Sequence, residues 1–235
     1  MGRIRRASCV LFVVFAGVSA GAVPGQAPLP SELPPTVRRV SDTTYEVGRL
    51  HVDTARREVV APATLNGVQI LEFVANAKAG AKAYESALTV DVNAITFNTA
   101  LLLIGLDPSR GRPPKAVFDQ AQAAGDPVEM LVSWGERTVP LEELLYDQRT
   151  KKTVPPGTWV YTGSTFIKDG AGRQRYAAEL DGVLIGLMHS PSAIIERVDA
   201  QAGYGATVTN PELGLAAGAA VTLTIRALPR PAGNR

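Results

Sequence analysis

The fold of this chain is decided most clearly by the stretch WVYTGSTFIKDGAGRQRYAAELDGVLIGLMH, which runs from Trp159 to His189. Three extended runs in it are separated by the segment 168–173 and by Asp181-Gly182. Asp-Gly pairs favour tight hairpin turns because glycine accepts a positive φ. The stretch therefore predicts three neighbouring antiparallel strands arranged as a meander.

Other patterned segments extend this sheet. Residues 50–52 and 58–60 flank a polar turn and predict a hairpin, and an apolar strand is predicted over 68–74. Residues 128–134 and 221–226 alternate between apolar and polar side chains. Such alternation is typical of strands with one face on a core and the other in water.

Two helices are predicted between these strands. Residues 93–105 place Phe97, Leu101 and Ile104 at helical spacing, and the unbroken apolar run 100–104 leaves no polar face. Residues 140–146 place leucines on one stripe above two glutamates, which predicts a short surface helix. The predicted fold class is α+β: a mainly antiparallel sheet of hairpins and a meander, one buried central helix and one short surface helix.

Residues 1–20 have the composition of a secretory signal peptide. Three arginines precede an uncharged run of 12 residues, 7–18, and the small residues after it suit cleavage behind Ala20. Twelve residues fall short of the roughly 20 that a spanning helix needs. We expect an exported protein, periplasmic or secreted, with no membrane span in the mature chain.

Removing this segment changes the charge and the thiol content. The chain of 235 residues has 24 Lys and Arg, 22 Asp and Glu, one cysteine and a net charge of +2. Loss of Arg3, Arg5, Arg6 and Cys9, with no acidic residue, leaves a net charge of −1 and no cysteine. The mature chain then lacks the basic excess that nucleic-acid binding requires and the thiols of disulfides or Cys-ligated clusters. We expect no nucleic-acid partner, no metal and no cofactor.

The proline pattern divides the rest of the chain. Residues 21–44 carry closely spaced prolines and predict an extended linker. Residues 45–228 are long enough for one domain with a substantial core. Residues 229–235 predict a short disordered tail.

The strong catalytic motifs are absent from the sequence. It has no phosphate-binding loop, no dinucleotide fingerprint, no zinc-protease motif and no serine-hydrolase elbow. Only His51 and His189 could serve as histidine bases, and their contexts favour structural roles. Carboxylates are numerous, but no spacing places two of them together.

One polar segment is a candidate site. Tyr84, Glu85 and Ser86 precede a strand that leads into the predicted central helix, where Asn98 shares a stripe with Leu102. The amide of Asn98 should be part-buried and should therefore need a hydrogen-bond partner. These four residues predict either a polar network that ties strand to helix or a small ligand pocket on that seam.

The sequence resembles the YdjY-like domain family of exported bacterial proteins over about residues 49–228. Each matching piece is short, but their order and spacing agree with the family. The pieces are Tyr84-Glu85-Ser86-Ala87-Leu88, the run 100–106 with Pro108, Gly125-Asp126-Pro127-Val128 leading to Trp134, the segment 155–164, and Gly182-Val183-Leu184-Ile185 before Pro191 and Ile194.

This resemblance implies a departure at the candidate site. Family members often have histidines where Tyr84 and Asn98 stand, so a metal or proton-transfer role of those histidines would be lost here. Some relatives are described as ferredoxin-like or carry cysteine-rich iron–sulfur segments, which the mature chain cannot match. The family supplies no catalytic residues to carry over.

Three functions follow as expectations. The first is a non-catalytic binding or interaction module of the envelope, with an envelope protein or a small ligand as partner. The second is a hydrolase-like envelope enzyme that uses Glu85 or Asp91 as acid–base groups while Ser86 and Tyr84 position the substrate. The third, from the family association alone, is an accessory to electron transfer.

Overall fold

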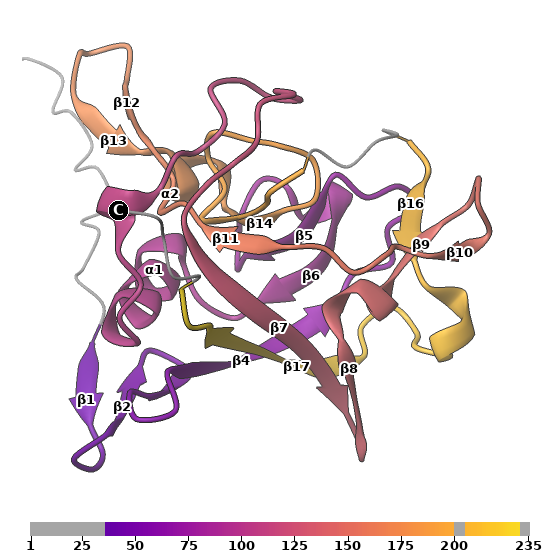
Figure 1. Ribbon diagram of the computed structural model, residues 1–235, viewed down its shortest axis with the longest axis horizontal. Helices are drawn as coiled ribbons and strands as arrows, with labels where there is room; N and C mark the ends of the chain where they lie inside the picture. Colours follow the sequence, from indigo (N-terminus) through magenta and orange to yellow (C-terminus); the bar gives the residue numbers. More distant parts are fainter. Residues whose placement is uncertain (1–35, 200–204, 231–235) are drawn as a thin grey trace, which may run out of the picture. The chain divides into compact units, whose positions relative to one another are not determined.

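The computed structural model in Figure 1 describes residues 36–199 and 205–230. The predicted signal peptide lies outside these residues, as do most of the predicted linker and tail. Among the described residues, none of the helices combines the length and the hydropathy of a membrane-spanning segment.

Eight strands close into a barrel, because each of them pairs with two others in a ring. The strand β4 closes the ring, because it pairs with β17 on one side and with β6 on the other. In ring order the strands are β4 (Glu58–Leu65), β17 (Ala220–Ala227), β7 (Asp126–Trp134), β11 (Trp159–Tyr161), β15 (Ile195–Arg197), β14 (Val183–Gly186), β5 (Phe73–Ala77) and β6 (Ser86–Val90).

The predicted fold class is wrong. The described chain is mostly β, and its main sheet is mixed, since β5 pairs parallel with β6 and β14 pairs parallel with β15. A parallel pair joins segments whose connection must cross over, and that crossover leaves no local turn signal in the sequence. The sheet is therefore a closed mixed barrel with additional strands, not a mainly antiparallel sheet built from hairpins and a meander.

The stretch 159–189 does not form a meander. Strand β11 pairs with β7 and β15, while β12 (Phe166–Lys168) and β13 (Gln174–Tyr176) form a separate two-stranded hairpin. Asp181-Gly182 ends the helix α2 (Ala177–Asp181), and Gly182 has a φ of +76°. The glycine supplies the left-handed residue that commonly follows a helix, so the expected hairpin turn is a helix end.

The remaining strands extend the barrel or form a small sheet beside it. The predicted hairpin is confirmed by the pairing of β3 with β4, and β1 lies inside the range predicted as linker. These strands are β1 (Val37–Arg39), β2 (Thr44–Val47), β3 (Leu50–Asp53), β8 (Arg137–Pro140), β9 (Leu145–Asp147), β10 (Lys152–Thr153) and β16 (Thr207–Thr209).

The helix α1 (Ala94–Leu103) lies where the buried helix is predicted. Asn93 caps its first turn by accepting a hydrogen bond from the Thr96 backbone at 2.8 Å. Phe97 and Leu101 are fully buried, whereas Leu102 is exposed, so one side of the helix faces solvent. The predicted surface helix at 140–146 is instead a 3-10 turn, Leu141–Leu144, whose two leucines are buried.

The core fills the barrel and the space under α1. Alternate residues of β7 and β17 point into it, among them Val132, Leu223 and Ile225, which are completely buried. This alternation is the one predicted for both strands, and it fixes their register because a shift by one residue would expose the apolar set.

Candidate functional site

A polar pocket lies at the N-terminal ends of the parallel strands β5 and β6. The pairing of Phe73 with Ser86 sets their register, and the Glu72 backbone N–H donates to the Glu85 carbonyl at 2.9 Å. Because the two strands are parallel, the residues that precede them lie at the same edge of the barrel. Glu72 and Glu85 therefore stand side by side.

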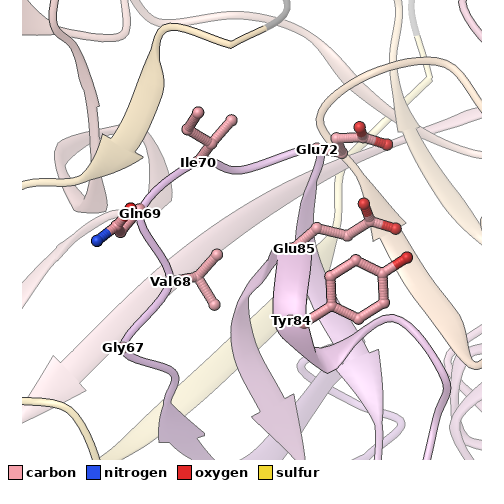
Figure 2. Close-up of a pocket in the computed structure, with 7 residues that line it drawn as sticks. All are labelled: Gly67, Val68, Gln69, Ile70, Glu72, Tyr84 and Glu85. Carbon is pink, nitrogen blue, oxygen red and sulfur yellow. The ribbon is translucent and has the colours of Figure 1, made fainter.

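The pocket has a volume of about 490 Å³ and is lined by residues 67–70, Glu72, Tyr84 and Glu85. We call it the acidic pocket. Figure 2 shows the side chains of Glu72, Glu85 and Tyr84 projecting in one direction from neighbouring segments. Ile70 and Tyr84 are 44% and 67% exposed and give the rim an apolar character. The strand predicted over 68–74 begins only at Phe73, and the residues before it form this loop.

Lys82 compensates one of the two carboxylates. Its Nζ donates to Glu85 Oε1 at 2.6 Å and lies 5.6 Å from the ring centre of Tyr84. The hydrogen bond to Glu85 raises the pKa of Lys82, which therefore stays charged. In the described residues Glu72 has no ion pair, so the acidic pocket carries one negative charge in excess.

A part-buried polar network joins the two segments that line the pocket. The hydroxyl of Ser86 donates to the Lys82 carbonyl at 2.7 Å, and the Asn66 side-chain amide donates to the Ser86 carbonyl at 2.9 Å. The Thr89 hydroxyl lies 3.0 Å from both Asn66 Oδ1 and Asn76 Oδ1 and shares its one donor between them. The 3-10 turn Ala83–Glu85 is thus tied to the loop opposite, which holds the two walls of the pocket together.

The structure separates the four predicted site residues. Tyr84 and Glu85 line the acidic pocket, whereas Ser86 is completely buried and outside its lining. Asn98 accepts a hydrogen bond from the Tyr161 hydroxyl at 2.7 Å and ties α1 to β11. Asn98 is therefore part-buried and has a hydrogen-bond partner, as the sequence predicts, but this contact is not part of the pocket.

Sequence reasoning missed Glu72 and Lys82. Glu72 lies 13 residues before Glu85, which is also the offset between Phe73 and its partner Ser86. That offset becomes visible only when the parallel register of β5 and β6 is known. Lys82 gives a local signal, because a lysine three residues before a glutamate can reach it across one helical turn.

The two histidines have different environments. His189 is completely buried, with its ring nitrogens 2.8 Å from the carbonyl oxygens of Asp119 and Arg197, so it joins a loop to β15. Its neighbour Ser190 pairs through its hydroxyl with Ser192 at 2.9 Å. His51, expected to be a hydrogen-bonded strand residue, is exposed on β3. Among the described residues no three His, Cys, Asp or Glu side chains gather as metal ligands.

The fold and the pocket define a class of protein: a mostly β domain, built on a closed mixed barrel, that has a ligand-sized acidic pocket at the ends of two parallel strands. The sequence profile of the YdjY domain matches residues 50–226, and the chain belongs to this family. No curated protein and no solved structure matches the chain.

Proposed function

We propose that this protein is an exported, non-catalytic binding module of the envelope, and that the acidic pocket binds a small ligand with an ammonium group next to an apolar body. The observation that carries this proposal is the side-by-side placement of Glu72 and Glu85 in one pocket. Only one lysine, Lys82, compensates their two negative charges there.

The electrostatics support a cationic ligand. Two like charges placed side by side repel each other, so a second carboxylate next to Glu85 favours the binding of a cation. Lys82 compensates Glu85, which leaves Glu72 able to pair with a positive group in the pocket. A charge-assisted hydrogen bond of this kind contributes about 1.5–3 kcal/mol.

The shape of the pocket supports a small ligand. Its volume of about 490 Å³ lies within the range of roughly 300–1,000 Å³ typical of small-molecule sites. Val68, Ile70 and the ring of Tyr84 provide apolar surface around the carboxylates. A ligand with an ammonium head and an aromatic or aliphatic body satisfies both parts of the lining.

The binding test uses phenethylamine as the cationic probe and phenylacetate as its anionic counterpart of similar shape. We expect the full chain to bind phenethylamine and not phenylacetate in a calorimetric titration. Glu72→Gln should weaken phenethylamine binding by about 10- to 100-fold, the equivalent of one charge-assisted hydrogen bond. Glu136→Gln is the matched control, because Glu136 is exposed and outside the pocket.

Two results would overturn the proposal: equal binding of the two probes, or equal loss of affinity in the Glu72 and Glu136 variants.

Export is tested separately by expressing the full chain with its own N-terminus and sequencing the product from the envelope fraction. Cleavage after Ala20 is expected, and an intact N-terminus in the cytoplasm would contradict export.

A hydrolase-like enzyme is the second candidate, and the same pair of carboxylates favours it. Two carboxyl groups in one pocket can donate and accept a proton in turn. Asp91, the alternative acid–base group expected from the sequence, lies at the opposite end of β6, so Glu72 is the second carboxylate of the pocket. Ser86 is buried and outside the pocket lining. Turnover of p-nitrophenyl glycosides that both Glu72→Gln and Glu85→Gln abolish would favour the enzyme, whereas no turnover by the full chain would exclude this reaction.

A further inference from the structure

The strand β4 changes its neighbour halfway along its length. Its residues 58–60 pair with β3, and its residues 63–65 pair with β6. Pro62 lies at this division. Because proline has no backbone N–H, the change of neighbour leaves no unpaired backbone donor at this residue. Its carbonyl accepts from the Asp91 backbone at 3.3 Å, which fixes the residue after β6 against β4.

A hollow of about 360 Å³ opens at this division. We call it the basic hollow. It is lined by Arg49, Pro62, Ala63, Thr64, Lys78, Thr89, Asp91 and Ala220. Two adjoining hollows of about 220 and 330 Å³ share Pro62 with it. They leave room for the rest of a ligand whose charged group binds in the basic hollow.

Asp91 holds two cations at this hollow. Lys78 Nζ lies 2.6 Å from Asp91 Oδ1, and Arg49 Nε lies 3.0 Å from Asp91 Oδ2. The hydrogen bond from Lys78 holds the pKa of Asp91 below its usual range, so the carboxylate stays ionised. Two cations and one carboxylate leave one positive charge in excess.

The backbone positions both cations. Arg49 is the second residue of the two-residue turn between β2 and β3, in which Gly48 has a φ of +60°. A Cβ atom at Gly48 would lie 3.0 Å from the Thr96 side chain, so the positive φ and this close contact both favour glycine there. Lys78 follows β5 directly, in the same register that places Asp91 after β6.

Several donors remain unused. A lysine has three N–H donors and an arginine has five, and one nitrogen of each contacts Asp91. Thr64, an exposed residue of the same lining, adds a hydroxyl group. These three groups can satisfy the three terminal oxygens of a phosphate monoester, whose charge exceeds the single positive charge of the hollow.

We propose that the basic hollow, formed by Arg49, Lys78 and Thr64 where the sheet divides at Pro62, is a second binding site, and that it takes the phosphate group of a phosphate monoester. The site does not depend on the acidic pocket, because the two share no lining residue. The phosphate binds Lys78 and the free guanidinium nitrogens of Arg49, while Asp91 keeps both cations in place.

The test measures binding of inorganic phosphate, glycerol 3-phosphate and phosphatidic acid vesicles to the full chain, with phosphatidylcholine vesicles as the neutral control. Lys78→Met should lower affinity for inorganic phosphate by roughly tenfold or more. The matched control is Lys152→Met, which removes an exposed lysine outside the hollow. Arg49→Met gives an independent variant on an exposed turn, and thermal unfolding shows whether each variant is folded.

Each outcome decides the proposal. Lys78-dependent binding of the soluble phosphates supports the site and identifies a soluble source, and Lys78-dependent binding to phosphatidic acid vesicles supports it with a lipid headgroup as source. If inorganic phosphate fails to bind, or if Lys78→Met and Lys152→Met lower its affinity equally, the site is a surface ion pair and the proposal is wrong.

Discussion

The acidic pocket and the basic hollow lie at opposite ends of the same two strands. At the N-terminal ends of β5 and β6 the register places Glu72 beside Glu85, and at the C-terminal ends it places Lys78 beside Asp91. One end therefore carries two carboxylates with one lysine, and the other end carries two cations with one carboxylate. A single parallel pair thus presents sites of opposite charge at its two edges.

The difference lies in the residues that flank the strands. Within β5 and β6 the buried apolar residues belong to the core, whereas Asn76, Ser86 and Thr89 form hydrogen bonds with uncharged groups. The residue just outside each strand decides the charge at that edge. The predictions below test whether the two edges act as separate sites of opposite preference.

The largest expected effect comes from reversing the charge of Glu72. Glu72→Lys places a cation where the ammonium group of phenethylamine should bind, and a juxtaposition of like charges costs several kcal/mol. We expect calorimetry to show a loss of affinity greater than about 100-fold, with phosphate binding unchanged. A parallel loss of phosphate affinity would show that the two edges are not separate.

The next effect concerns Asn98, which belongs to neither site. Burial raises the pKa of Tyr161, so its hydroxyl is neutral and donates to Asn98. Asn98→Ala leaves that hydroxyl without its partner and should lower the free energy of unfolding by about 1–3 kcal/mol in urea titrations. The control is Leu102→Ala on the same helix, which should lower the free energy of unfolding less because Leu102 is exposed. If Asn98→Ala changed the affinity for either probe, Asn98 would belong to a binding site, contrary to this assignment.

A smaller effect should follow from Asp91→Asn, which removes the negative charge of the basic hollow. The phosphate then faces two cations without the opposing carboxylate, so its affinity should rise by about three- to tenfold. Isothermal titration with inorganic phosphate measures this change. A fall in affinity would mean that the fixed position of the cations matters more than the net charge.

Salt concentration should affect ligand affinity differently at the two sites. The side chains of Arg49 and Lys78 are each 67% exposed, whereas those of Lys82 and Glu85 are 33% and 13% exposed. Screening acts mainly on exposed charges, so raising NaCl from about 0.05 to about 0.5 M should weaken phosphate binding by a larger factor than phenethylamine binding. Equal salt dependence in paired titrations would contradict this ranking.

The smallest expected effect is a dependence of stability on pH. The pKa of Asp91 is lowered in the folded protein by its hydrogen bond to Lys78, so its stabilising contribution is fully present above its unfolded pKa of about 3.9. That contribution is lost as the pH falls through the lower folded pKa. Urea titrations between about pH 5 and pH 2 should show a smaller decline for Asp91→Asn than for the wild type, whereas identical declines would contradict the assignment.

Local patterns in the sequence predict local structure well in this protein. The β3–β4 hairpin follows from a local turn, the strands β7 and β17 from the alternation of apolar and polar residues, and the position of α1 from the helical spacing of its apolar residues. Closure of the barrel cannot be found in this way, because it depends on β4 pairing with β17 from the other end of the chain.

The candidate site likewise has parts that local sequence patterns predict and parts that depend on long-range pairing. Tyr84 and Glu85 stand out as polar residues before a strand, but their partner Glu72 depends on a parallel register that no turn announces. Asn98 shows the converse, since its need for a partner was predictable while the identity of Tyr161 as that partner was not.

The most direct test of this account is one amide NMR titration series of the full chain with phenethylamine and with inorganic phosphate. We predict that phenethylamine shifts the resonances of residues 67–72 and 84–85, that phosphate shifts those of Arg49, Thr64, Lys78 and Asp91, and that neither probe competes with the other. Shifts at one shared set of residues, or displacement of one probe by the other, would contradict two oppositely charged sites at the ends of β5 and β6.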